Sequence, residues 1–185
     1  MRLDAATRSR VRGVSWRPGC PVGLDDLRLV RAEHWGFDGK VHQGVLVVHR
    51  RVAGSMLQVM RELFGLHYPV AGMRLVDDYG ADDDRSMAAN NTSAFNCRTV
   101  DGSTSWSEHA YGRAIDLNPI QNPYVPRSGD VSPPAGRRFA DRGRHDPGVI
   151  HAGDPVVRAF ARAGWKWGGN WTSPRDYQHF STTGR

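Results

Sequence analysis

SEHAYGRAID, residues 107–116, is the stretch of the chain that decides the expected fold, because it places His109 and Asp116 seven positions apart. In one continuous helix these two side chains would lie about 10 Å apart along the axis. That is too far for two bonds of ~2 Å to one zinc ion, so a helix fits poorly. If the chain instead turns at Gly112 and continues as a strand, His109 can fold back over Asp116. We therefore expect a mixed α and β domain in which a strand carries one metal ligand.

A second stretch, DYQHF at residues 176–180, supplies another carboxylate and another imidazole. Asp176 and His179 are three positions apart, so a helical turn or a tight loop places both at the same rim. Two neutral imidazoles and one carboxylate leave a fourth zinc position open for water, as catalytic zinc sites do. The sequence therefore predicts one zinc ion per chain, with His109, Asp116 and His179 as candidate ligands. Asp176 is the candidate general base.

Together with WGGNW at residues 167–171, these stretches resemble one family, the zinc peptidases that include D-Ala-D-Ala carboxypeptidases and L-alanyl-D-glutamate endopeptidases. VanY-like enzymes and several phage endolysins belong to it. The resemblance is to the pattern SxHxxGxAxD followed by WGGxWxxxxDxxHF, and it covers about residues 70–180. The positions that match are Ser107, His109, Gly112, Ala114, Asp116, Trp167, Gly168, Gly169, Trp171, Asp176, His179 and Phe180.

The resemblance implies an α+β fold in which a small antiparallel sheet carries the zinc site and helices flank it. It also implies the roles given above for the four metal-site residues, although some family members carry Glu where this chain has the shorter Asp176. SAFNCR at residues 93–98 is similar to the family strand that brings an arginine to the substrate. Arg98 is thus the candidate for orienting a substrate carbonyl or carboxylate. Ser107 and Trp171 are further candidates for substrate binding, although large aromatics are also typical of a core.

The activity that the resemblance implies is hydrolysis of a peptide bond in the peptidoglycan stem peptide. We expect the bond between L-alanine and D-glutamate to be the target, with D-Ala-D-Ala cleavage as the alternative. A different class of function is a zinc-stabilised wall-binding module without turnover, but the retention of Asp176 beside His179 argues against it. Such a protein acts at the bacterial cell wall, outside the cell or in the periplasm, or after release from the cytoplasm during phage lysis.

Length and charge limit the other possibilities. A chain of 185 residues is expected to form one domain, residues 1–185, with an irregular lead-in over 1–40 and a catalytic core over 70–180. No apolar run is long enough for membrane insertion, and no apolar signal core follows the basic N-terminus. The net charge of +6 suits an anionic polymer such as the cell wall. The basic residues are scattered, so we expect no nucleic-acid partner, and we expect a monomer.

Periodicity and turn residues predict the local elements around the site. We expect strands at 44–49 and 73–79, helices at 52–64 and 155–163, a solvated acidic loop at 81–84, a long surface loop at 118–151, and a strand at 165–171 that turns at its glycines. Cys20 and Cys97 lack metal-binding spacing, so they form either one disulfide or two buried thiols. A disulfide would tie the lead-in to the segment that bears Arg98.

Overall fold

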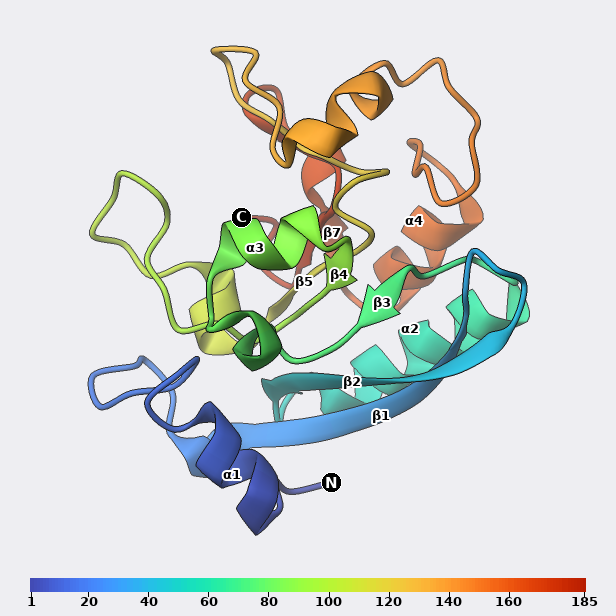
Figure 1. Cartoon of the computed structure of the whole chain (residues 1–185). Helices are drawn as coiled ribbons and strands as arrows, with labels where there is room; N and C mark the ends of the chain where they lie inside the picture. The colour runs from blue at the N-terminus through green and yellow to red at the C-terminus, as the bar shows by residue number, and fades with distance from the viewer.

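The computed structural model describes residues 1–185 and shows a long, curved β-hairpin with the rest of the chain packed around it (Figure 1). Strand β1 (Leu27–Trp35) pairs antiparallel with β2 (Val41–His49) over its whole length. Helix α2 (Ala53–Gly65) packs against β1. Helix α1 (Ala5–Val11) belongs to the N-terminal segment on the other face of the hairpin.

The hairpin separates two hydrophobic clusters because successive side chains of a strand point to opposite faces. Leu46 and Val48 belong to the larger cluster, together with α2 and the strands of the site. Leu29 and Val47 belong to the smaller cluster, together with apolar residues of the lead-in. The N-terminal segment thus contributes to burial of the sheet.

The prediction of an irregular lead-in over residues 1–40 is wrong in two places. Asp4 caps α1, because its carboxylate accepts a hydrogen bond of 2.8 Å from the backbone N–H of Thr7. Residues 27–35 form β1, and their sequence LRLVRAEHW contains the alternation that identifies a half-buried strand. This strand pattern was present in the sequence, but the glycines and prolines before it led to the prediction of an irregular segment.

The site is carried by a small antiparallel sheet in the order β5-β9-β7, as expected from the resemblance. Strand β9 (His179–Ser181) lies in the middle, between β5 (Ala114–Asp116) and β7 (Lys166–Trp167). Ile115 and Phe180 are directly opposite each other in this sheet and are fully buried. Their burial anchors the sheet in the larger cluster, so the polar side chains of the same strands are held at fixed positions.

Several of the predicted elements are confirmed. The helix expected over 52–64 is α2, and the helix expected over 155–163 is α4 (Pro155–Arg162). The strand expected at 44–49 is part of β2, and the strand expected at 165–171 begins as β7 and turns at its glycines. The remaining short elements are η1 (Leu24–Asp26), β4 (Asn91–Thr92), η3 (Glu108–Tyr111), η5 (Gly168–Asn170) and β8 (Arg175–Asp176), with β6 (Tyr124–Val125) and η4 (Pro134–Ala140) inside the long loop.

The strand expected at 73–79 is wrong. Only β3 (Gly72–Met73) is extended and paired, and the chain then forms the 3-10 turn η2 (Val76–Tyr79). Asp77 in this turn accepts hydrogen bonds from the backbone N–H of Ser15 at 3.1 Å and from its hydroxyl at 2.9 Å. This long-range contact with the lead-in, which local sequence does not reveal, favours the turn over a strand.

The acidic segment 81–84 is not the solvated loop that was expected. Asp82 is the N-cap of helix α3 (Asp83–Ala88), and its carboxylate accepts a hydrogen bond of 2.9 Å from the N–H of Arg85. Acidic residues in the first turn of a helix interact favourably with its partial positive charge. The run of aspartates is therefore a helix start, and it brings Asp83 close to the site described below.

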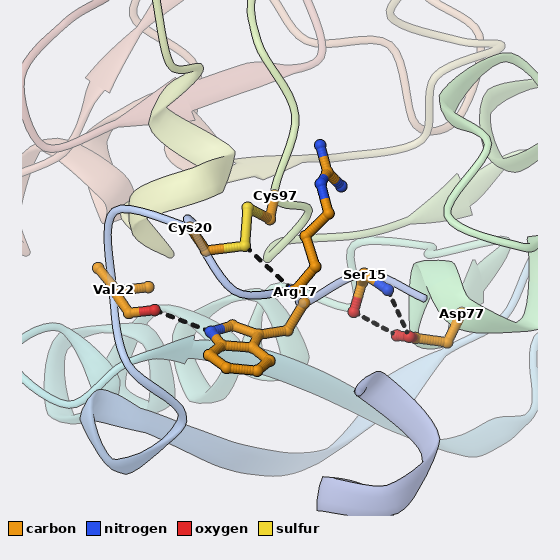
Figure 2. The surroundings of a disulfide bond; sticks show 7 residues. Ser15, Arg17, Cys20, Val22, Asp77 and Cys97 are labelled. Carbon is orange, nitrogen blue, oxygen red and sulfur yellow. Dashed lines mark hydrogen bonds between the residues drawn. A yellow bond between two sulfur atoms is a disulfide. The ribbon is translucent and has the colours of Figure 1, made fainter. Parts of the chain in front are cut away.

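Cys20 and Cys97 form a disulfide, which is the first of the two alternatives left open by the sequence. Figure 2 shows the bond between the lead-in and the segment before Arg98, with the Ser15–Asp77 contact on the same part of the lead-in. The backbone N–H of Cys97 also donates to the carbonyl of Ser15 at 3.0 Å. A covalent bond and hydrogen bonds thus fix the lead-in to the backbone next to Arg98.

Removing this disulfide is expected to lower the free energy of unfolding by about 4–5 kcal/mol, because the bond closes a long loop in the unfolded chain. Its two cysteines are 77 positions apart. The double substitution C20S/C97S should therefore show an earlier urea midpoint than the oxidised protein, and reduced wild type should match the double mutant. Equal midpoints for oxidised and reduced protein would contradict the expectation.

Candidate metal centre

Asp116 and His179 face each other across two neighbouring strands. Asp116 ends β5, His179 begins β9, and the two residues are direct partners in the antiparallel register. Directly opposite residues in such a pair have Cβ atoms about 5 Å apart and lie on the same face of the sheet. The backbone of Asp116 also exchanges hydrogen bonds of 2.9 and 3.1 Å with Ser93 on its other side. Pairing on both edges fixes the position of this carboxylate.

His109 reaches the same place from the turn η3. The hydroxyl of Ser107, the N-cap of η3, accepts a hydrogen bond of 3.3 Å from the N–H of His109. Gly112 ends the turn with φ of 64°, and a Cβ at this position would lie 2.7 Å from the backbone nitrogen of His49. Only glycine combines that conformation with so close an approach. The expected turn at Gly112 is therefore confirmed, and it folds His109 over the strand that ends in Asp116.

Three ligand atoms converge in this place. Nε2 of His109 lies 3.2 Å from Nδ1 of His179, and these nitrogens lie 3.2 and 3.1 Å from the two carboxylate oxygens of Asp116. A tetrahedral zinc site with bonds of ~2.0–2.1 Å places its ligand atoms about 3.3 Å apart. The residues His109, Asp116 and His179 are 3%, 5% and 6% exposed, so the centre is shielded from solvent.

The hydrogen bonds behind the two imidazoles determine which nitrogens face the centre. Nδ1 of His109 lies 2.6 Å from the carbonyl oxygen of Ala94, and Nε2 of His179 lies 2.9 Å from the backbone oxygen of Arg185. These oxygens only accept hydrogen bonds, so each outer nitrogen carries the proton, and in the neutral ring the inner nitrogen presents a lone pair. Two lone pairs and a carboxylate at mutual distances near 3.2 Å repel one another unless a cation lies between them. The donor set therefore fits a divalent metal ion.

In the metal-free protein a proton on His179 offsets part of the repulsion between the ligand atoms. Burial alone would raise the pKa of Asp116, but the imidazoles of His109 and His179 outweigh it and hold the pKa well below its usual range. Burial alone would lower the pKa of His179, but the hydrogen bond to Asp116 and its charge raise it to about 9. The centre thus attracts positive charge strongly.

Asp176 lies beside this centre without belonging to the ligand set. A Cβ at Gly168 would lie 3.1 Å from Cβ of Asp176 and 3.3 Å from Cβ of His179, so both side chains approach Gly168 from one side. Oδ1 of Asp176 is buried and has no hydrogen-bond partner in the protein. Burial and the charge of Asp116 raise the pKa of Asp176 to about 7. A carboxyl group with these properties can accept and release a proton near neutral pH.

The three residues expected to contact substrate differ in their surroundings. The hydroxyl of Ser107 caps η3, as described above, which places it behind His109. Trp171 is partly exposed, and its ring lies 5.5 Å from the ring of His179, with Nε1 donating to the carbonyl of Gly184. Arg98 forms an ion pair with Asp83. Their contacts with substrate stay predictions.

One residue near the site was not anticipated from the sequence. Asp83 at the start of α3 lies 2.6 Å from Nη2 of Arg98 through its Oδ2. Burial raises the pKa of Asp83, Arg98 lowers it, and the charge of Asp116 raises it further. Asp83 is thus near enough to the metal centre to interact with its carboxylate. The only sequence signal was an acidic run, which by itself does not distinguish a helix start from a site residue.

Comparison with known families agrees with this geometry. Residues 101–182 match a family model described as D-alanyl-D-alanine carboxypeptidase. The match supports a peptidase of that kind, and the matched segment contains the three candidate ligands and Asp176. Arg98 and Asp83 precede it. No curated protein and no solved structure gives a significant match.

The buried group of His109, Asp116 and His179 could bind a metal ion. It is the one cluster of potential metal ligands in the structure whose ligand atoms lie close together. Peptidases similar to the matched family typically use zinc, which agrees with the nitrogen and oxygen donors found here. Separately, none of the helices combines the length and the apolar character that crossing a bilayer requires.

Proposed function

We propose that the protein is a zinc-dependent peptidase that hydrolyses a peptide bond in the peptidoglycan stem peptide, with the L-Ala–D-Glu bond as its target. The observation that carries the proposal is the pair of inward-facing imidazole nitrogens beside Asp116, with the unpartnered carboxylate of Asp176 next to them. Three ligands with one open position are the arrangement of catalytic zinc sites, whereas structural sites close the fourth position with protein.

The roles of the protein groups follow from their positions. When bound, the zinc ion supplies the positive charge that polarises the scissile carbonyl and the attacking water. Asp176 accepts a proton from that water at its buried Oδ1 as the water oxygen bonds to the carbonyl carbon. It then passes the proton to the nitrogen of the leaving amine as the C–N bond breaks, which leaves a carboxylate and an amine. Ala94 and Arg185 hold the two imidazoles through their backbone oxygens, which keeps both rings oriented during the reaction.

A second candidate is D-Ala-D-Ala carboxypeptidase activity, which the description of the matched family favours. Both candidate bonds are followed by a D-amino acid whose α-carboxyl group is next to the bond that breaks. The same metal centre and the same Asp176 would serve both reactions. A zinc-stabilised module without turnover does not need a carboxyl group whose pKa is raised to about 7 beside the metal position.

The proposed place of action is the bacterial cell wall, and the proposed partner is the stem peptide. The net charge of +6 favours accumulation on an anionic wall polymer, an attraction that salt weakens. We propose that the protein works as a monomer and does not engage nucleic acid.

Digestion of purified sacculi tests the proposed function. Zinc-loaded protein is expected to release soluble stem peptides or free alanine, and protein treated with a chelator is expected to release neither until zinc is restored. Mass spectra identify the bond: cleavage after L-alanine gives peptides that begin with D-glutamate, whereas carboxypeptidase activity releases free alanine. Intact sacculi and unchanged stem peptides after treatment with zinc-loaded protein would refute the proposal.

A further inference from the structure

The ion pair between Asp83 and Arg98 places a charge-neutral pair of side chains near the candidate metal centre, because the backbone of Asn96, two residues before Arg98, is hydrogen-bonded to His109. Their closest atoms are 2.6 Å apart, and both side chains are mostly shielded from solvent. Shielding strengthens the attraction between the two charges relative to a pair on the surface. The pair is therefore a fixed feature of the site.

The backbone around this pair is held rigidly. Cys97, next to Arg98, carries the disulfide to Cys20 (Figure 2). Asn96 is buried and joins the two sides of the site: its backbone N–H donates to the carbonyl of His109 at 3.2 Å, and its side chain donates to Ala81, just before α3, at 3.2 Å. The fold thus holds the backbone at Arg98 and the start of α3 close to each other, which keeps the two side chains within reach of one another.

The pair offers both hydrogen-bond donors and hydrogen-bond acceptors. Nη1 of Arg98 lies 3.4 Å from the carbonyl of Thr99, and the buried Nε has no acceptor in the protein. Since a guanidinium has five N–H donors, Nη1 and Nη2 each keep one that neither Thr99 nor Asp83 occupies. Asp83 keeps lone pairs that Arg98 does not occupy. A carboxamide or peptide group matches this combination, because its oxygen accepts and its N–H donates.

A carboxylate does not match it. Asp83 already neutralises Arg98, and the charge of Asp116 lies near enough to raise the pKa of Asp83. A bound zinc ion would be balanced by Asp116 and by Asp176 acting as base. An incoming carboxylate would therefore meet Asp83 without a free cation to offset the repulsion.

From this arrangement we propose that Asp83 sets the charge preference of the site, so that the enzyme selects an uncharged amide over a carboxylate next to the scissile bond. In a stem peptide the amide is either a D-isoglutamine in place of D-glutamate or a peptide group that continues the chain beyond D-alanine. This inference rests on the proposed function, because it assigns Arg98 and Asp83 to substrate recognition. It makes Asp83 a specificity-determining residue that lies outside the segment matched to the peptidase family.

Matched substrates that differ by one charge test the proposal. One pair of stem peptides carries D-glutamate or D-isoglutamine after L-alanine, and the other ends in D-Ala-D-Ala as the free acid or as its amide. For the bond that is cleaved, wild type is expected to show kcat/KM about tenfold higher for the amide member. D83N and D83A should reduce this ratio to about twofold or invert it. D83A is included because the asparagine side chain of D83N could still hold Arg98 by a hydrogen bond.

Asp84→Asn is the control, because it removes the same charge from the same turn of α3 at an exposed position. It should keep the wild-type ratio. A preference of wild type for the carboxylate, or an unchanged ratio in both Asp83 variants, would overturn the inference.

Binding separates this inference from the proposed function. In an Asp176→Ala background, zinc-loaded protein with and without the D83N substitution is titrated calorimetrically with both members of each pair. The ratio of amide affinity to acid affinity should be about tenfold with Asp83 present and about twofold with D83N. This expectation does not depend on whether the wild-type enzyme hydrolyses the peptide. If the wild-type enzyme cleaves nothing but the ratio depends on Asp83, the hydrolytic function fails and the role of Asp83 stands. Equal binding, or no binding, of acid and amide would overturn the role of Asp83.

Discussion

Asp176→Ala is expected to retain zinc and to lose hydrolysis by about 100- to 10,000-fold, the range in which general acid–base groups contribute to catalysis. The substitution removes the proton acceptor and none of the three converging ligands. The buried Oδ1 has no partner in the protein, so its removal breaks no hydrogen bond. Stoichiometric zinc by elemental analysis, together with kcat/KM on a stem peptide, measures both parts of the expectation.

The control for this prediction is Asp130→Ala, which removes an exposed carboxylate from the long loop. It is expected to leave kcat/KM unchanged within about twofold, as distant surface substitutions generally do. Asp176→Glu is expected to recover part of the lost activity, because it restores the carboxylate with one extra methylene. Full activity of Asp176→Ala would show that the proton acceptor is another group.

The half of the candidate metal centre that His109 and Asp116 form could be predicted because its determinants are local. The seven-residue spacing between these residues argued against a continuous helix, and Gly112 marked the turn. The structure explains why that glycine is needed, since a side chain there would collide with the backbone of His49. The facing positions of Asp116 and His179 in one sheet follow from the register of β5 and β9.

Other parts of the site depend on contacts between distant segments, which the sequence does not encode locally. The oxygens of Ala94 and Arg185 that orient the imidazoles are backbone atoms and carry no sequence signal. Asp83 reaches Arg98 only because α3 and the disulfide-linked segment pack together. The 3-10 turn at residues 76–79 likewise depends on a contact between Asp77 and the lead-in. Sequence motifs predict the candidate metal ligands, whereas tertiary packing determines which groups contact those ligands from behind.

Loss of the metal ligand set is expected to abolish both zinc binding and activity, and His109→Ala is the sharpest way to test it. The substitution leaves one imidazole and one carboxylate, too few to hold a catalytic zinc ion. His42→Ala is the matched control, because His42 is an exposed histidine on the β-hairpin, outside the metal cluster. Wild type and His42→Ala should bind one zinc per chain, and His109→Ala should bind none. Full zinc content in His109→Ala would refute its role as a ligand.

The pH dependence of stability gives an independent readout of the same centre. In metal-free protein the folded state raises the pKa of His179 to about 9. Protonated His179 therefore stabilises the folded state fully below its unfolded pKa of ~6.5, and this contribution is lost as pH rises through about 9. Asp176, with its pKa raised to about 7, also favours the folded state at lower pH and loses that contribution as pH rises from ~4 to 7.

The stabilisation by zinc should instead increase with pH, because the metal competes with the proton for Nδ1 of His179. Chelated protein is expected to melt at progressively lower temperature as pH rises from 6.5 to 9, while the increase in melting temperature caused by zinc grows. At zinc concentrations 1,000-fold above Kd the stabilisation is about 4 kcal/mol, or about 10 °C for a chain of this size. Thermal melts with zinc and with chelator across this range measure the effect. A zinc-induced shift that is the same at pH 6.5 and pH 9 would show that no proton leaves His179 when the metal binds.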